Sequence, residues 1–90
     1  MTDVIQGPVI DVIDGDTFEI EVAKVGKDNE YEYNEVERIR IADIDAPELN
    51  TGAGKRSKAA LQRKLKGKEV RCDVQARDKY GRIIAKVKPV

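Results

Sequence analysis

Hydrophobic and polar residues alternate over several short stretches of this 90-residue chain. The clearest stretch is residues 17–22, where Phe18, Ile20 and Val22 share one face of an extended segment, and the apolar run 9–13 precedes it. Period-two alternation and short apolar runs predict β-strands. Similar composition recurs at residues 36–44, 70–75 and 83–87, so we expect five strands.

Turn-forming and helix-capping residues separate these strands. Residues 14–16, Asp-Gly-Asp, predict a hairpin turn between the first two strands. Pro47 is expected to end the third strand, because proline cannot donate to a strand ladder. A helix is predicted from Ser57, a suitable N-cap, to Gly67, a typical C-cap residue, with Ala60, Leu61 and Leu65 on its apolar side.

The order of these elements indicates a fold class. One helix between the third and fourth of five strands is typical of a small Greek-key barrel of the OB type. We therefore predict a single, mainly β domain over residues 1–90, with a flat meander sheet covered by the helix as the competing architecture. No apolar run of about 18 residues or signal-peptide pattern occurs, so we expect no membrane segment.

The residue types present restrict the chemistry of any metal site. The chain has one cysteine and no histidine, so it lacks the ligands that zinc and copper sites require. Cys72 alternates with polar residues, which predicts a buried strand position for it. Any metal site is therefore expected to consist of oxygen ligands around a hard cation.

The net charge is zero, but the charges are unevenly distributed. Residues 1–50 carry fourteen acids and four bases, whereas residues 51–90 carry thirteen bases and three acids. This asymmetry predicts an acidic, metal-binding edge beside a surface that attracts polyanions, or else mutual neutralisation across the fold. The seven bases between residues 55 and 68 fit a solvated helix face and a phosphate-backbone footprint equally well.

Three short motifs contain the candidate chemistry. The first, DGDT at residues 14–17, brings Asp14 and Asp16 to a tight turn, where a cation would relieve their repulsion, although such turns are more often structural. Its spacing does not fit an EF-hand calcium loop. The second motif is RIRIADIDAPE at residues 38–48, and the third is DKYGR at residues 78–82.

In order and spacing, these motifs resemble the staphylococcal nuclease, or thermonuclease, family over residues 9–87. The resemblance implies an OB-fold barrel that hydrolyses phosphodiester bonds of DNA or RNA with Ca²⁺. In this family Asp16 and Asp45 correspond to direct calcium ligands, the main-chain carbonyl of Ala46 to a third ligand, and Asp14 to a residue that supports the hydration shell. Glu48 corresponds to the general base.

The resemblance also implies a set of substrate contacts. Arg40 and Arg82 correspond to the arginines that hold the phosphate and stabilise the transition state, and Lys79 and Tyr80 to contacts with a terminal phosphate. These roles agree with general chemistry, because guanidinium groups and a divalent cation oppose the negative charge that develops on phosphorus. In a chain without histidine, a carboxylate such as Glu48 is the expected general base.

Two readings from other classes stay open beside the nuclease. One is a catalytically inactive OB module that binds nucleic acid, and the other is a structural domain whose acids merely bind calcium. The complete set of Arg40, Glu48 and Arg82 beside the acidic pair favours the nuclease.

The resemblance further predicts how the barrel edge is completed. The family continues beyond the position of Val90 with a last strand and two helices, so we expect a barrel truncated at its C-terminus. Closure could come from a strand of a second copy, from a strand within residues 23–37, or not at all, and an edge left open would favour pairing of two copies into a homodimer.

Overall fold

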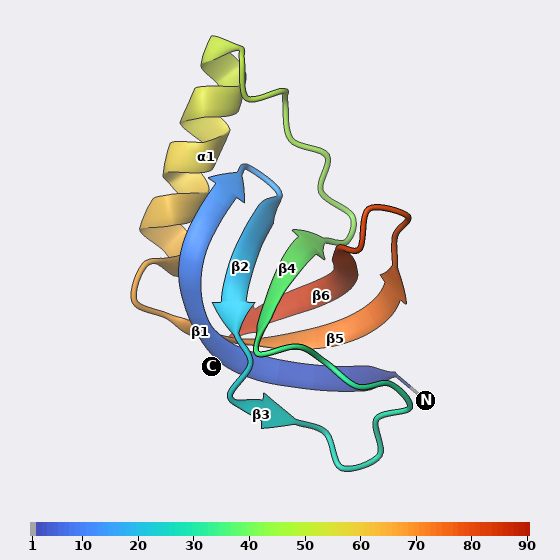
Figure 1. Ribbon diagram of the computed structural model, residues 1–90. Coiled ribbons are helices and arrows are strands. Elements are labelled where there is room, and N and C mark those ends of the chain that lie inside the picture. Colours follow the sequence, from blue (N-terminus) through green and yellow to red (C-terminus); the bar gives the residue numbers. More distant parts are fainter. Residues whose placement is uncertain (1) are drawn as a thin grey trace.

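In the computed structural model, which describes residues 2–90, the first strand is long and strongly bent (Figure 1). This strand, β1 (Asp3–Asp14), pairs with β5 (Glu69–Arg77) through residues 3–8 and with β2 (Thr17–Glu21) through residues 9–14. Register shifts within the second half accompany the bend. One strand therefore connects two sides of the structure.

The remaining strands close the barrel. β2 pairs with β4 (Val36–Ile41), β4 runs parallel to β6 (Ile83–Pro89), and β6 pairs with β5. Each of these five strands has a hydrogen-bonded neighbour on both sides, which confirms the predicted OB-type barrel and excludes the flat meander. The prediction of an open barrel edge is wrong, because β4 pairs with β6. The argument for a homodimer that forms through an open edge therefore no longer applies. The short β3 (Lys24–Val25) pairs outside the barrel with β1.

Strand boundaries differ from the sequence-based prediction where inward positions are not apolar. β1 begins at Asp3 instead of residue 9. Asp3 and Gly7 are buried on the same side as Ile5, so residues 3–7 lack the alternation of apolar and polar residues that predicts a strand. β4 ends at Ile41, so Pro47 does not terminate it. Instead, Asp43 adopts a left-handed conformation (φ 69°), which aspartate tolerates better than most residues.

The helix α1 (Gly52–Leu65) begins five residues before the predicted start at Ser57. Its N-cap is Thr51, whose Oγ1 accepts a hydrogen bond of 2.9 Å from the backbone N–H of Gly54. The predicted end is confirmed, since Gly67 follows the C-cap with a φ of 70°. Among residues 2–90, no helix combines the length and apolar character needed to cross a membrane.

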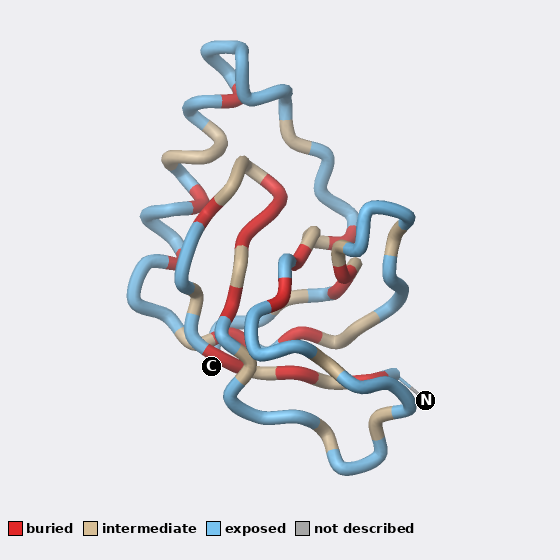
Figure 2. The backbone as a smooth tube through the Cα atoms, viewed as in Figure 1, coloured by how far each residue is buried: buried red, intermediate tan, exposed pale blue. Residues whose placement is uncertain are grey.

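The core lies inside the barrel and under α1, where the buried segments of Figure 2 concentrate. Cys72 is buried as predicted, and burial raises the pKa of its thiol to about 12. Leu61 and Leu65 cover the barrel from α1, whereas Ala60, expected on the same side, is exposed. The fully buried hydrophobic residues of the strands are Ile5, Phe18, Ile20, Ile39, Val70, Cys72, Ile83 and Ala85.

Candidate functional site

The β1–β2 turn carries a buried carboxylate that connects it to the loop 42–51. Asp16 Oδ1 accepts a hydrogen bond of 2.8 Å from the Thr17 hydroxyl, and Asp16 Oδ2 accepts one of 3.2 Å from the backbone N–H of Ala46. Asp14 Oδ1 in turn accepts from the backbone N–H of Asp16 at 3.1 Å. Most of the loop is exposed (Figure 2), so this contact helps to fix its position.

Two glycines allow the turn, the loop and α1 to approach one another closely. A Cβ atom at Gly15 would lie 2.6 Å from Ser57 Cβ and 2.8 Å from Ala46 Cβ, and one at Gly54 would overlap the carbonyl oxygen of Glu48. Side chains at these positions would push the loop away from the barrel. The sequence patterns do not predict these roles, because Ala46 and Ser57 lie far from Gly15 along the chain and the approach of Glu48 to Gly54 depends on the path of an irregular loop.

Arg40 connects the buried carboxylate to an exposed one. Its Nη2 atom lies 3.7 Å from Asp16 Oδ2 and 3.7 Å from Asp45 Oδ1. Arg40 also faces Thr17 in the β2–β4 register, which places its backbone beside the turn. Asp14, Asp16, Arg40 and Asp45 therefore form one cluster, called the turn cluster below.

The two carboxylates of the turn differ in their affinity for a proton. Burial raises the pKa of Asp14, and its interaction with Asp16 raises it further. Burial also acts to raise the pKa of Asp16, but the interaction with Asp14, the hydrogen bonds from Thr17 and Ala46 and the charge of Arg40 outweigh it and lower that pKa. Asp16 is therefore the member of the pair that keeps its negative charge.

The donor atoms of the turn cluster fit a hard cation. Within residues 2–90 no group of three or more acidic, histidine or cysteine side chains is arranged as a ready-made metal site. The candidate ligands are two carboxylates that approach the same guanidinium, together with the backbone of Ala46, which contacts Asp16. Such an all-oxygen set suits Ca²⁺ or Mg²⁺ and leaves coordination positions for water.

Glu48 occupies the exposed part of the same loop. Its backbone carbonyl accepts hydrogen bonds from the N–H and the hydroxyl of Thr51, at 3.1 and 2.7 Å, which ties it to the start of α1. Within residues 2–90 its carboxylate has no hydrogen-bond or ion-pair partner. The group is therefore available to accept a proton or to bind a ligand.

The turn between β5 and β6 fixes Arg82. Asp78 accepts hydrogen bonds from Arg82 Nε at 2.7 Å, from the Arg82 N–H at 2.9 Å and from the Tyr80 N–H at 3.0 Å. Burial acts to raise the pKa of Asp78, but these bonds outweigh it and lower the pKa. Because Asp78 engages Nε, the terminal nitrogens of Arg82 remain for a phosphate.

Lys79 and Tyr80 lie at the tip of this turn. The Tyr80 side chain is exposed, with Lys79 Nζ 5.2 Å and Arg82 Cζ 5.4 Å from its ring centre. The turn leads into β6, whose residue Ile84 lies opposite Arg40 on β4. Arg82 therefore comes directly before the strand that neighbours the strand of Arg40, although no contact joins the two arginines within the described residues.

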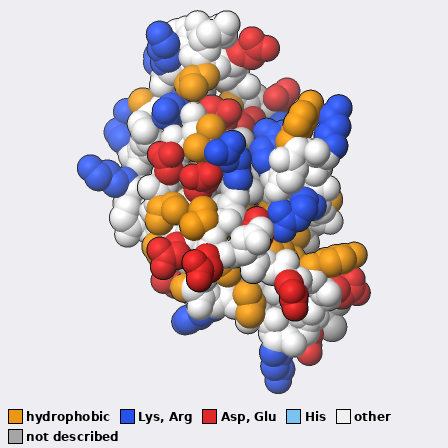
Figure 3. Space-filling view, viewed as in Figure 1, with side chains coloured by type: hydrophobic (Ala, Val, Ile, Leu, Met, Phe, Trp, Pro, Cys, Tyr) orange, Lys and Arg blue, Asp and Glu red, His pale blue; other side chains and the backbone are white. Residues whose placement is uncertain are grey.

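Acidic and basic side chains are intermixed on the face shown in Figure 3, while basic side chains line the edge formed by α1. The acidic residues 1–50 and the basic residues 51–90 meet through the pair of Arg77 with Glu37, whereas the pairs of Arg40 with Asp16 and of Arg38 with Glu19 both lie within residues 1–50. Partial neutralisation and a local acidic cluster coexist on this surface.

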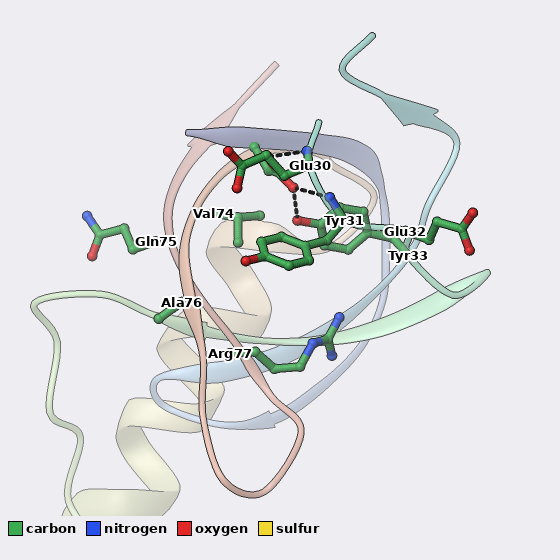
Figure 4. Close-up of a pocket in the computed structure, with 9 residues that line it drawn as sticks. Glu30, Tyr31, Glu32, Tyr33, Val74, Gln75, Ala76 and Arg77 are labelled. Atoms are coloured by element: carbon green, nitrogen blue, oxygen red, sulfur yellow. Dashed lines mark hydrogen bonds between the residues drawn. The ribbon is translucent and has the colours of Figure 1, made fainter. Parts of the chain in front are cut away.

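A separate groove, of about 620 Å³, lies between residues 30–33 and β5 (Figure 4). Asp3 at its base accepts hydrogen bonds from the backbone of Glu30 and Tyr31 and from the Tyr33 hydroxyl, and Arg77 is paired with Glu37. The buried carboxylate of Asp3 is thus already engaged, and the acidic lining of the groove repels polyanions. The turn cluster with the β5–β6 turn is the better candidate site.

Comparisons with known proteins give a family match and several individual relatives. The family model described as staphylococcal nuclease homologue matches residues 38–89. An uncharacterized endonuclease of Escherichia coli is 35% identical over 83 residues, which are 92% of this chain and 48% of the relative. Protein ParB of Escherichia coli is 34% identical over 83 residues, covering 92% of this chain and 41% of the relative.

A micrococcal nuclease of Shigella flexneri is 32% identical over 82 residues, which are 91% of this chain and 41% of that protein. The chain therefore spans less than half the length of these curated relatives.

Proposed function

This chain belongs to the family of staphylococcal nuclease homologues, and on that premise we propose that it hydrolyses phosphodiester bonds of DNA or RNA with Ca²⁺ as its cofactor. The observation that carries the proposal is the position of Arg40, which lies 3.7 Å from both Asp16 and Asp45 on the strand next to β6 and Arg82. Carboxylates for a cation and guanidinium groups for a phosphate thus lie on one face.

The cation would be held by Asp16, Asp45 and the carbonyl of Ala46, with Asp14 orienting the waters around it. When bound, Ca²⁺ supplies positive charge against the developing negative charge of the phosphate and helps to orient water. The buried, hydrogen-bonded Asp16 keeps its charge, which suits a ligand. The exposed Asp45 is free to adjust its position.

The residues around the phosphate have different roles in the reaction. Glu48 accepts a proton from water as the water oxygen bonds to phosphorus and one phosphorus–oxygen ester bond breaks, and the leaving oxygen takes a proton from solvent. Arg40 and Arg82 donate hydrogen bonds to the phosphate oxygens, whose negative charge grows in the transition state. Lys79 and Tyr80 contact a terminal phosphate beside Arg82.

Digestion of single-stranded DNA and of RNA by the purified chain tests this proposal. We expect cleavage with calcium, none with chelator, and a loss of cleavage in Glu48→Gln and Arg82→Ala. Arg71→Gln, which removes a positive charge from an exposed ion pair on β5, serves as the charge control and is expected to cleave normally.

Either failure of this experiment has a definite meaning. Binding without cleavage by the wild-type chain would identify an inactive nucleic-acid-binding module. Cleavage that persists undiminished in both variants would show that the assigned residues do not carry the reaction. Magnesium, tested in parallel, determines whether calcium is the required cation.

A further inference from the structure

A second groove, of about 450 Å³, lies beside Arg82 and outside the turn cluster. Two guanidinium groups, an exposed aromatic ring and a partly exposed valine line it, along with one carboxylate. This combination matches what a nucleotide presents, namely a negative phosphate and a flat base. The lining residues are Glu19, Val36, Arg38, Tyr80, Gly81 and Arg82.

Arg38 enters this groove because of the alternation along β4. Glu37 and Ile39 are buried on the inner side of the strand, so Arg38 and Arg40 both project outward. Alternate residues of a strand are roughly 7 Å apart, a spacing comparable to that of consecutive phosphates in an extended nucleic-acid strand. Arg38 therefore extends the row of phosphate-binding groups from Arg40 into the groove.

Glu19 restrains Arg38 without burying it. The two residues face each other in the β2–β4 register, and Arg38 Nε and Nη2 lie 3.3 and 3.1 Å from the same oxygen, Glu19 Oε2. Both side chains keep contact with solvent, with exposed fractions of 48% for Arg38 and 24% for Glu19. Exposed ion pairs of this kind contribute little stability, so a phosphate can replace Glu19 as the partner of Arg38.

We propose that this groove binds the nucleotide next to the scissile phosphate. Arg38 contacts the phosphate of that nucleotide, and Glu19 limits the affinity by competing for Arg38. The exposed ring of Tyr80 contacts the base, while its hydroxyl remains available for the terminal phosphate. The inference rests on the proposed nuclease function and adds a substrate-binding residue to it.

The proposal makes the role of Arg38 depend on substrate length. A dinucleoside monophosphate has one phosphodiester, which Arg40 and Arg82 would hold, and no second phosphate for Arg38. A single-stranded oligonucleotide supplies that second phosphate. An effect of Arg38 that appears only with the longer substrate would therefore separate this groove from the reaction centre.

Steady-state kinetics on the two substrates provide the first test. In Arg38→Gln we expect kcat/KM to fall about tenfold on the oligonucleotide, mainly through KM, and to stay unchanged on the dinucleoside monophosphate. Glu19→Gln is expected to lower KM for the oligonucleotide a few-fold. Matched controls are Arg71→Gln and Asp73→Asn, which break a similarly exposed ion pair of 3.2 Å on β5 with the same changes of charge.

Binding of the oligonucleotide to the Glu48→Gln protein, titrated at several salt concentrations, provides the second test. Loss of one phosphate contact in Arg38→Gln should reduce the salt dependence of log K by about 0.7 for a single strand. If Arg38→Gln behaves like Arg71→Gln while the wild type cleaves, the groove proposal is overturned and the nuclease stands. If the wild type neither binds nor cleaves, the proposed function fails as well.

Discussion

Two clusters of carboxylates and arginines lie in different parts of the barrel, and they differ in how completely their hydrogen bonds are satisfied. In the end network, which consists of Asp3, Tyr33, Glu37 and Arg77, the guanidinium of Arg77 meets both oxygens of Glu37 at 3.2 and 3.1 Å. In the turn cluster, Arg40 approaches its two carboxylates no closer than 3.7 Å.

One carboxylate of the turn cluster, Asp45, is also far more exposed than the carboxylates of the end network. The Glu37 side chain is 4% exposed and also accepts a hydrogen bond from the backbone of Asn34, whereas the Asp45 side chain is 97% exposed. A buried carboxylate is stable only when its hydrogen bonds are satisfied, but an exposed one retains capacity for a ligand. Residue types alone therefore do not distinguish a structural network from a binding site. The completeness of hydrogen bonding and the exposed fraction of the carboxylate side chains do distinguish them.

The largest expected effect comes from removing the arginine of the turn cluster. In Arg40→Gln the rate of phosphodiester cleavage should fall about 10²–10³-fold, since a preorganised donor to the developing charge is lost. The melting temperature should change little, because the ion pairs are long and partly exposed. Cleavage assays and thermal melts, with Arg71→Gln as the control, measure both quantities. Unchanged cleavage would refute the assignment of this cluster.

Removing the arginine of the end network should lower the stability of the protein and leave cleavage unchanged. Arg77→Ala leaves the Glu37 carboxylate buried with only its bonds from Asn34, so the free energy of unfolding should fall by about 2–3 kcal/mol. Cleavage per folded molecule should stay normal. Urea titration measures the stability, and Arg71→Ala is the exposed control. Equal stability of the two variants would show that the end network is not structural.

The smallest effect is a dependence of stability on pH at Asp3. Hydrogen bonds to its carboxylate, from the Glu30 N–H first and also from Tyr33 and Tyr31, outweigh burial and lower its pKa. Folding therefore favours the charged form, and this contribution is present above the ordinary aspartate pKa of about 3.9 and is lost as pH falls through the lowered value.

Urea titrations from pH 6 to pH 2 on the wild type and Asp3→Asn check this expectation. The wild type should be the more stable protein at pH 6, and the difference should shrink below about pH 4. A difference that stays constant across the range would mean that the carboxylate charge does not hold residues 30–33.

The sequence by itself determined the local features of this protein. Alternation at residues 17–22, the glycine turn at residues 14–16 and Gly67 after the helix all depend on neighbours within a few positions, and the structure confirms each of them. The family resemblance rests on the same local motifs, which is why the candidate residues could be named before any contact was known.

Tertiary structure alone decided the closure of the barrel and the assembly of the site. The parallel pairing of β4 with β6 and the bend of β1 depend on contacts between segments that lie far apart along the chain. Gly15 meets Ser57 of α1 although the two lie far apart along the chain, and Arg40 reaches Asp16 only because β2 and β4 are neighbours. Local patterns carry no information about such distant partners, since they record the period of an element but not what packs against it.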